Sequence, residues 1–319
     1  MSLLEVDQLK TYFRISRGYV RAVDNVSFSL EKGEAIGLAG ESGCGKTTTA
    51  LSILKILPSN GEILEGRIMF SGIDVTKISD EKMRRDIRWK GISIVFQGAM
   101  NAFNPVFRVG DQLVEAITLH EDIQKSEAVT RAKKLLELVG IEPSRFSNYP
   151  HEFSGGMKQR ALIAMSISSN PSVLIADEPG TALDVIVQAQ ILKLLRELKK
   201  NLNLSMILIT HDLSIIAETC EKVAIMYAGK IVEYGSVFEI FREPLHPYTI
   251  GLLAAFPNIK AAKTRMRAIQ GYPPDLLDPP PGCRFHPRCK YAMDICRQKE
   301  PALIPDNKGR CVACHLVNK

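Results

Sequence analysis

Three glycines, a lysine and a threonine stand at a spacing that suits the binding of a phosphate group. The stretch "GESGCGKT" (residues 40–47) matches the pattern G-x-x-x-x-G-K-[ST], and it lies between a strand-like apolar run and a helix-like segment. The glycines allow the backbone to curl so that its N–H groups converge on phosphate oxygens. Lys46 would reach the β- and γ-phosphates, and Thr47 would offer its hydroxyl to Mg²⁺. The pattern therefore predicts a nucleotide phosphate site.

Two adjacent carboxylates end a second apolar run, "SVLIADE" (residues 172–178). Burial of two carboxylates costs free energy unless a cation or a proton transfer uses them. Asp177 would hold Mg²⁺, and Glu178 would orient and polarise an attacking water. Taken alone, the pair could equally well cap a helix. Together with a phosphate-binding loop, the catalytic interpretation is favoured.

A third stretch, "FSGGMKQR" (residues 153–160), places Ser154, Gly155 and Gly156 in front of a helix-like segment. The N-terminus of such a helix suits an anion. Simple capping of a helix over residues 157–168 explains the same residues equally well. Because the chain also contains the phosphate-binding loop and the two adjacent carboxylates, we favour the interpretation that these residues bind an anion.

Strands and helices alternate along most of the chain, which predicts an α/β domain with a largely parallel sheet. The expected strands span residues 34–40, 172–178 and 205–212, and each ends in polar residues. Because ligands bind at the carboxyl ends of parallel strands, the site residues should gather there. Residues 126–140 are expected to form an amphipathic helix, and residues 223–235 a hairpin.

Composition narrows the class of protein. Of the 319 residues, 45% are apolar and 24% are charged, as in soluble globular proteins, and the length suffices for one large domain with a smaller appendix. No apolar run is long enough to span a membrane and the N-terminus lacks the layout of a signal peptide, so we expect a cytoplasmic protein. Residues 260–319 hold twelve Lys and Arg against five Asp and Glu, whereas residues 1–259 carry a net charge of −1. A nucleic-acid partner is not expected, because it would need a basic surface on the main domain.

The motifs follow one another in the order found in the ATP-binding subunits of ABC transporters, which the chain resembles over about residues 3–254. Besides the three stretches above, the resemblance rests on Gln97 in "IVFQGAMNAFNP", on Asp184 in "VLIADEPGTALD" and on His211 in "LITHD". It implies a RecA-like P-loop ATPase core with an antiparallel β part, and an inserted helical subdomain at about residues 100–165 that carries the signature "FSGGMKQR". It also implies that two such domains pair head to tail, so that the signature of one faces the γ-phosphate held by the other.

The resemblance assigns a role to each site residue. Gln97 would sense Mg²⁺ and the lytic water, His211 would contact the γ-phosphate, and Asp184 would couple the two sites. The implied ATP-binding residues are Tyr12, Gly40, Glu41, Ser42, Gly43, Cys44, Gly45, Lys46, Thr47, Thr48 and Gln97. The implied Mg²⁺ ligands are Thr47, Gln97 and Asp177, the residues facing the partner's ATP are Ser154, Gly155, Gly156 and Gln159, and the catalytic residues are Glu178 and His211. Tyr12 is chosen to stack on adenine, with Tyr19 and Arg17 as alternatives.

Five of the seven cysteines lie in the last forty residues, after the proline-rich stretch "GYPPDLLDPPPG" (residues 271–282), which excludes a helix and marks a boundary. They are Cys283, Cys289, Cys296, Cys311 and Cys314. Disulfides are disfavoured by the expected compartment, which leaves zinc or an iron–sulfur cluster. On spacing alone zinc is slightly favoured, because Cys311-x₂-Cys314 resembles half of a zinc site.

The tail also resembles a particular branch of the family. "IFREPLHPYTIGLLAAFP" (residues 240–257) and "GYPPDLLDPPPGCRFHPRC" are similar to the C-terminal extension of dipeptide/oligopeptide permease ATPases of the D type. This resemblance implies a nucleotide-binding domain at residues 1–254 and a Cys-rich extension at residues 255–319. It shifts the metal prediction to a 4Fe-4S cluster, with zinc as the alternative, on Cys283, Cys289, Cys296 and Cys314. The charge of such a cluster could be offset by Arg284, Arg288 and Lys290.

The function implied by the resemblance is that of the ATP-hydrolysing subunit of an importer of peptides or related small solutes such as nickel or oligosaccharides. The implied partners are a second ATPase subunit in a homodimer or heterodimer, two transmembrane permeases and an extracellular solute-binding protein. An ABC ATPase that acts on nucleic acid or ribosomes is a rival, but only 107 residues separate Gly45 from Phe153, which leaves no room for a long insertion. A structural adaptor with a zinc-binding tail and an inactive ATPase is a second rival. It is disfavoured because the chain retains all four catalytic side chains, Lys46, Asp177, Glu178 and His211.

Overall fold

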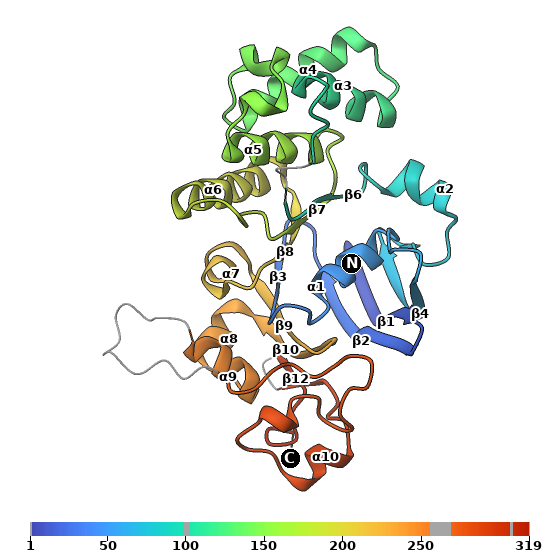
Figure 1. Cartoon of the computed structure of the whole chain (residues 1–319), viewed down its shortest axis with the longest axis vertical. Coiled ribbons are helices and arrows are strands. Elements are labelled where there is room, and N and C mark those ends of the chain that lie inside the picture. The colour runs from blue at the N-terminus through green and yellow to red at the C-terminus, as the bar shows by residue number, and fades with distance from the viewer. Residues whose placement is uncertain (1, 99–101, 256–268, 307–308, 319) are drawn as a thin grey trace. The chain divides into compact units, whose positions relative to one another are not determined.

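The computed structural model describes residues 2–98, 102–255, 269–306 and 309–318, and Figure 1 labels its elements. The chain forms two compact units. Unit 1 comprises Met1–Glu31, Ala35–Lys77 and Ile209–Lys319, and unit 2 comprises Lys32–Glu34 and Ile78–Leu208. The division into domains that the sequence predicts, with a boundary after residue 254, stays a prediction.

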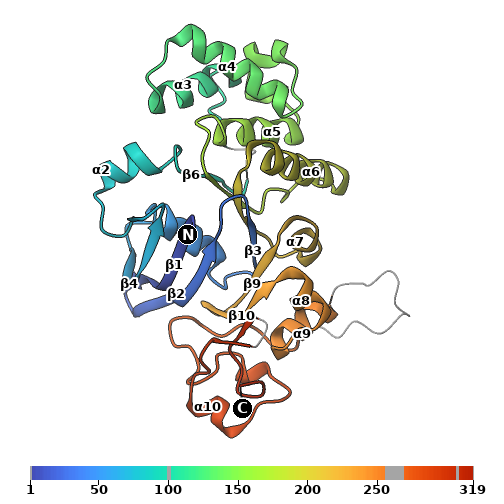
Figure 2. The same cartoon turned by 180° about the vertical axis from the view of Figure 1, so that it is seen from behind.

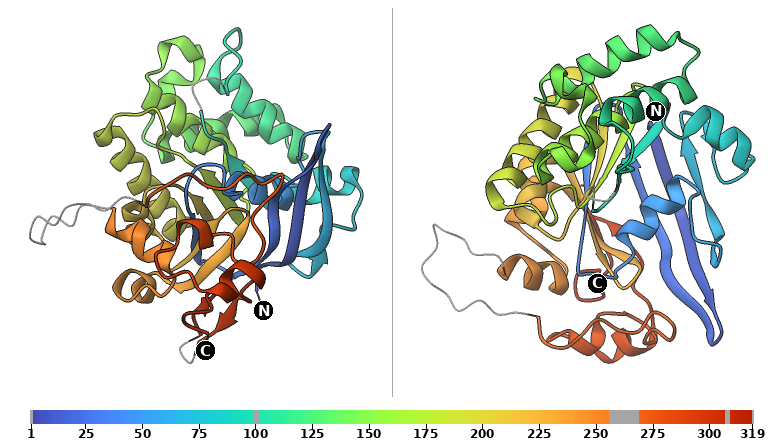
Figure 3. Two further views of the ribbon diagram at one scale, coloured as in Figure 1. Left: turned by 60° about the horizontal axis from the view of Figure 1, so that its bottom comes forward. Right: turned by 45° about the horizontal axis from the view of Figure 1, so that its top comes forward.

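Unit 1 contains the expected antiparallel β part. Its strands are β1 (Leu4–Ile15), β2 (Gly18–Leu30), β4 (Gly61–Phe70) and β5 (Ile73–Asp74). They lie in the order β2-β1-β4-β5, and every neighbouring pair is antiparallel. Apolar residues such as Leu4, Val6 and Leu9 are buried along β1 between more exposed ones, as in a sheet with one face on a core. Figure 3 shows the long strands of this sheet as a twisted layer.

The remaining strands of unit 1 lie in the order β11-β12-β10-β9-β3. They are β3 (Ala35–Ala39), β9 (Lys222–Tyr227), β10 (Lys230–Ser236), β11 (Ile304–Pro305) and β12 (Cys311–Val312). Strands β3 and β9 are parallel, and β3 is buried over its whole length. The predicted hairpin is confirmed as β9 and β10, joined at Ala228 and Gly229, whose φ angles of 49° and 83° form the turn.

Short helices complete unit 1. They are α1 (Lys46–Ile53), α7 (Leu213–Thr219), α8 (Val237–Arg242), α9 (Pro247–Ala254) and α10 (Asp294–Gln298). The strand expected over residues 205–212 ends earlier, because β8 stops at Ile209 and Asp212 caps α7 by accepting the Ser214 N–H at 2.8 Å. The chain after β8 therefore turns into a helix three residues after the strand ends.

Unit 2 contains parallel strands and a group of helices. Strands β6 (Ile92–Val95), β7 (Val173–Asp177) and β8 (Ser205–Ile209) lie in the order β8-β7-β6, and β6 and β7 are parallel. The helices are α2 (Asp80–Lys82), which continues into a π turn at Met83–Ile87, α3 (Val109–His120), α4 (Lys125–Leu138), α5 (Gly155–Ser166) and α6 (Val185–Leu202). Helices α3, α4 and α5 pack on one another, as Figures 1 and 2 show. The predicted amphipathic helix is α4, and it ends before Gly140, whose φ angle is 75°.

Within the described ranges, no helix combines the length and the apolar character that a passage through a bilayer requires.

Candidate active site

The phosphate-binding loop follows β3 and leads into α1, as the pattern predicts. Gly40, Gly43 and Gly45 have φ angles of 150°, 78° and 106°, which side-chain-bearing residues rarely adopt. A Cβ atom at Gly40 would lie 2.1 Å from the Met226 carbonyl oxygen, and one at Gly45 would lie 2.2 Å from the Ala22 carbonyl oxygen. Both positions therefore require glycine for steric reasons as well as for backbone conformation.

Lys46 lies inside this loop. Its ammonium group donates to the carbonyl oxygens of Gly40 at 2.8 Å and of Glu41 at 3.0 Å, and its side chain is buried. Helix α1 begins without a side-chain cap, so its first N–H groups point into the loop region without a side-chain acceptor. Ser42 and Thr47 are exposed beside it. A glycine loop that encloses a lysine in front of an uncapped helix is the arrangement of a P-loop nucleotide-binding protein.

Two further predicted residues lie in unit 1. His211 is exposed just after β8. Tyr12 is half-buried in β1, and its hydroxyl donates to the Asp24 carboxylate at 3.0 Å. Burial, together with the nearby Asp24 carboxylate, raises the pKa of Tyr12 to about 12. The Tyr12 hydroxyl is hydrogen-bonded within the sheet, whereas the alternative Tyr19 is exposed. The choice of Tyr12 as the residue that stacks on adenine stays a prediction.

Unit 2 brings Gln97 and Glu178 together. The Gln97 Nε2 group donates to Oε2 of Glu178 at 2.9 Å, and the Thr181 hydroxyl donates to the same oxygen at 2.9 Å. Glu178 has a φ angle of 45°, so the backbone turns sharply directly after β7. Asp177 is buried at the end of β7. The carboxylate of Glu178 is therefore held in one orientation by two donors.

The signature residues and Asp184 lie at two helix starts in unit 2. The Ser154 hydroxyl accepts the Met157 N–H at 3.3 Å and so caps the start of α5. A Cβ atom at Gly156 would lie 2.6 Å from a methyl group of Val187 in α6. Gln159 is buried in α5, and the Asp184 carboxylate accepts the Val187 N–H at 2.9 Å at the start of α6.

The next two residues of α6 expose large apolar side chains. Val185 and Ile186 are 80% and 71% exposed, although they follow directly after Asp184. Apolar side chains this exposed beside a predicted site residue are typical of a surface that a partner covers.

Four of the tail cysteines lie near one another in unit 1. Burial, together with the nearby thiols of Cys296, Cys314 and Cys289, raises the pKa of the Cys283 thiol to about 11. The Cys283 N–H also donates to the Cys296 carbonyl at 2.8 Å. The pKa of Cys311, in contrast, is raised by burial and by Asp306, not by the other thiols. The assignment of Cys283, Cys289, Cys296 and Cys314 to a cluster stays a prediction. Yet no three His, Cys, Asp or Glu side chains in the part of the chain described here are arranged so that they could hold a metal ion.

The arginines of the tail pair with carboxylates. Arg284 donates to the Ala228 carbonyl at 2.5 Å and forms a buried ion pair with Asp24, and Arg288 forms an ion pair with Glu41. Their charges are therefore compensated within the protein, so the prediction that they offset the charge of a cluster is not supported.

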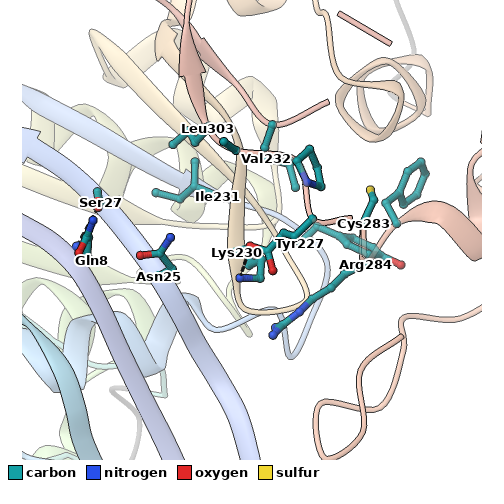
Figure 4. Close-up of a pocket in the computed structure, with 15 residues that line it drawn as sticks. Gln8, Asn25, Ser27, Tyr227, Lys230, Ile231, Val232, Cys283, Arg284 and Leu303 are labelled. Carbon is teal, nitrogen blue, oxygen red and sulfur yellow. Dashed lines mark hydrogen bonds and ion pairs between the residues drawn. The ribbon is translucent and has the colours of Figure 1, made fainter. Parts of the chain in front are cut away.

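Arg284 also lines a cavity of about 280 Å³ in unit 1, which Figure 4 shows. Cys283 and Arg284 of the tail, Lys230 of β10 and Asn25 of β2 contribute to its wall. The Lys230 ammonium lies 2.7 Å from the Glu300 carboxylate at this wall, and this ion pair joins the tail to the hairpin.

Comparisons with known proteins show to which family of P-loop nucleotide-binding proteins the chain belongs. The family model described as "ABC transporter" matches residues 23–181, and the model described as "Oligopeptide/dipeptide transporter, C-terminal region" matches residues 232–296. The chain is 44% identical to the oligopeptide transport ATP-binding protein AppD of Bacillus subtilis, over all of this chain (100%) and 98% of that protein. It is 45% identical to the dipeptide transport ATP-binding protein DppD of Escherichia coli, over 99% and 97% of the two chains.

Solved structures agree with the sequence comparisons. The structure of cbiO1 from Clostridium perfringens, part of the ABC transporter complex cbiONQ, is similar with a TM-score of 0.65 and 29% identity over 76% of this chain and 91% of that one. A dimeric bacterial ABC transporter cassette has the same fold, with a TM-score of 0.65 and 23% identity over 73% of this chain and 98% of that one. The chain belongs to the ATP-binding proteins of ABC transporters, in the oligopeptide and dipeptide transport family.

Proposed function

We propose that this chain is the ATP-hydrolysing subunit that powers an ABC importer of dipeptides, oligopeptides or related small solutes. The observation that carries the proposal is the identity of 44–45% over nearly the whole length of proteins named for oligopeptide and dipeptide transport. The chain works at the cytoplasmic face of a membrane, bound to two transmembrane permeases that receive the solute from an extracellular binding protein. A second ATPase subunit completes the assembly.

Within this function, the loop residues bind the phosphates of ATP. The N–H groups of the loop and of the start of α1 donate to phosphate oxygens. Lys46 exchanges its two loop carbonyls for the β- and γ-phosphate oxygens. Mg²⁺ supplies neutralisation of phosphate charge, and the side chains assigned to hold it are Thr47, Gln97 and Asp177. The exposure of Thr47 supports this assignment.

Glu178 acts on the attacking water. Gln97 and Thr181 both donate to its Oε2 atom, which fixes the plane of the carboxylate. A carboxylate fixed in this way can accept a hydrogen bond from water, orient that water and take its proton. His211 contacts the γ-phosphate in this scheme.

The partner ATPase completes the site. Ser154, Gly155, Gly156 and Gln159 of one chain face the ATP held by the other, and Asp184 couples the two sites. The exposed apolar pair Val185 and Ile186, next to Asp184, supports a covered surface at this position. The signature lies in unit 2 whereas the phosphate loop lies in unit 1, and the dimeric cassette among the similar structures supports pairing.

The pairing predicts how ATPase activity depends on protein concentration. If the signature of a second chain is needed, activity per mole of chain should rise with concentration, or should need the permease complex. Steady-state phosphate release across a hundredfold dilution series, with the association state measured by light scattering at each point, checks this. Constant specific activity from a chain that scatters as a monomer throughout would contradict the composite site and with it the proposed mechanism.

We further assign Cys283, Cys289, Cys296 and Cys314 to a structural 4Fe-4S cluster that joins the segments of the tail. The mutual proximity of these four thiols and the separation of Cys311 from them support this choice. The arrangement found here is not one that could hold a metal ion, so side-chain rearrangement has to accompany binding of the cluster. No step of ATP hydrolysis is assigned to it.

The cluster assignment predicts the metal content. Chain purified without oxygen should be brown and contain about four iron and four sulfide per chain. Cys296→Ala should lose most of this iron, whereas the matched variant Cys311→Ala should keep it. A colourless protein with stoichiometric zinc, or equal loss of iron in both variants, would contradict the assignment.

A further inference from the structure

The C-terminal part of unit 1 reaches the phosphate-binding loop at Glu41. The Nη1 and Nη2 atoms of Arg288 lie 2.6 Å and 2.9 Å from the two carboxylate oxygens of Glu41, which is a bidentate ion pair. The Arg288 side chain is 5% exposed and that of Glu41 27% exposed. Arg288 also donates to the Gln270 carbonyl at 3.0 Å, and its guanidinium lies 5.6 Å from the centre of the Tyr227 ring. Arg288 is thus fixed by the tail and by β9, and it holds Glu41 in turn.

A second contact holds the backbone of the same loop residue. The Glu41 N–H donates to the Tyr248 hydroxyl at 2.9 Å. Tyr248 is fully buried, and its ring packs against Tyr227 and Phe285 at centroid distances of 4.7 Å and 5.4 Å. The Tyr248 N–H donates to Nδ1 of His246 at 3.0 Å, and burial lowers the pKa of His246 to about 3, so this ring is neutral. The tyrosine hydroxyl that contacts the loop is therefore rigidly placed.

Both anchors come from outside the segment that the ABC transporter model matches. Arg288 and Tyr248 lie within residues 232–296, the C-terminal region shared with oligopeptide and dipeptide transporters, whereas Glu41 lies within residues 23–181. The C-terminal region therefore contacts the phosphate-binding loop at two groups of Glu41, its carboxylate and its backbone N–H.

The ion pair between Arg288 and Glu41 changes the charge beside the phosphate-binding loop. Glu41 is the second residue of the loop, and its carbonyl accepts from Lys46, the lysine assigned to the phosphates. A carboxylate here without a partner would repel the negative charge of a triphosphate. Arg288 compensates that carboxylate in a setting where solvent screens it only in part. Glu41 thus has two contacts at the site: its carbonyl accepts from the Lys46 ammonium, and its carboxylate is neutralised by Arg288.

We propose that the C-terminal region completes the nucleotide site, with Arg288 as a positioning residue that neutralises Glu41 and, together with Tyr248, holds the loop in its phosphate-binding shape. The inference rests on the proposed function of the loop as the ATP site. It gives the C-terminal region a role in ATP affinity, in addition to any role in holding cysteines.

The test compares the affinity of full-length variants for the non-hydrolysable analogue AMP-PNP with Mg²⁺. Arg288→Met should weaken binding about tenfold or more, as expected when a charge-assisted pair is broken and the carboxylate stays. Adding Glu41→Gln should recover most of that loss, because the repelling charge is then absent. Arg297→Met, an exposed arginine of α10, is the matched control and should bind as the natural chain does. The ratio of the Kd of Arg288→Met to that of the natural chain should fall as KCl is raised, because salt screens the repulsion.

The outcomes separate the inference from the function on which it rests. Lys46→Ala should lose AMP-PNP binding in the same assay. If it does and Arg288→Met binds normally, or if the double variant is no better than Arg288→Met, the inference is wrong while the proposed function stands. If Lys46→Ala binds as the natural chain does, the loop is not the ATP site and both fail. Should Arg288→Met not fold, Arg288→Gln carries the test: the positive charge is lost while the side chain stays polar, the same loss and the same recovery with Glu41→Gln are expected, and no loss would overturn the inference.

Discussion

The Glu178→Gln variant is expected to keep its ATP and to hydrolyse it about 10²–10⁴-fold more slowly than the natural chain. Glutamine has nearly the same shape, so Gln97 and Thr181 can still contact it, but it cannot take a proton from water. Lys46 and the loop N–H groups, which hold the phosphates, are untouched in unit 1. The bound nucleotide should therefore persist, and the variant should accumulate as an ATP-bound dimer.

Single-turnover hydrolysis and size-exclusion chromatography with ATP measure the two parts of this expectation. Glu197→Gln is the matched control, because Glu197 is an exposed glutamate of α6 that lies 3.8 Å from Lys193 and has no role in the site. It should turn over ATP as the natural chain does. Near-normal hydrolysis by Glu178→Gln would show that another group activates the water.

The local parts of the site could be read from the sequence because they depend on short-range geometry. Gly40 and Gly45 are needed where the loop has positive φ angles and passes carbonyl oxygens at distances that exclude a Cβ atom. Glu178 follows a strand whose apolar run is plain in the sequence, and the strand is β7. The hairpin of β9 and β10 follows from alternating residues around Ala228 and Gly229. Each of these features is determined by residues close together in the chain.

The contacts of the tail could not be predicted in this way. Arg288 and Glu41 are 247 residues apart, and Arg284 and Asp24 are 260 residues apart, so no periodicity or spacing relates them. The positive charge of the tail was a visible signal, but its partners were expected to be a metal cluster rather than carboxylates of the β part and the loop. Long-range pairing is decided by tertiary packing, which a single sequence does not display.

The complete transporter is expected to take up peptide only when this chain can hydrolyse ATP. Vesicles that contain both ATPase subunits and the two permeases, with Mg²⁺ and ATP enclosed and the solute-binding protein outside, should accumulate a labelled dipeptide or oligopeptide. Vesicles that enclose ADP should not, because no hydrolysis can drive the permeases. Glu178→Gln should lower uptake to the ADP level, while Glu197→Gln should leave it as in the natural complex.

This uptake assay joins hydrolysis by this chain to movement of the solute. We expect ATP-dependent peptide accumulation that stops when Glu178 alone is changed and that unlabelled peptide suppresses. Equal peptide uptake with enclosed ATP and enclosed ADP, or full uptake by the Glu178→Gln complex, would contradict it.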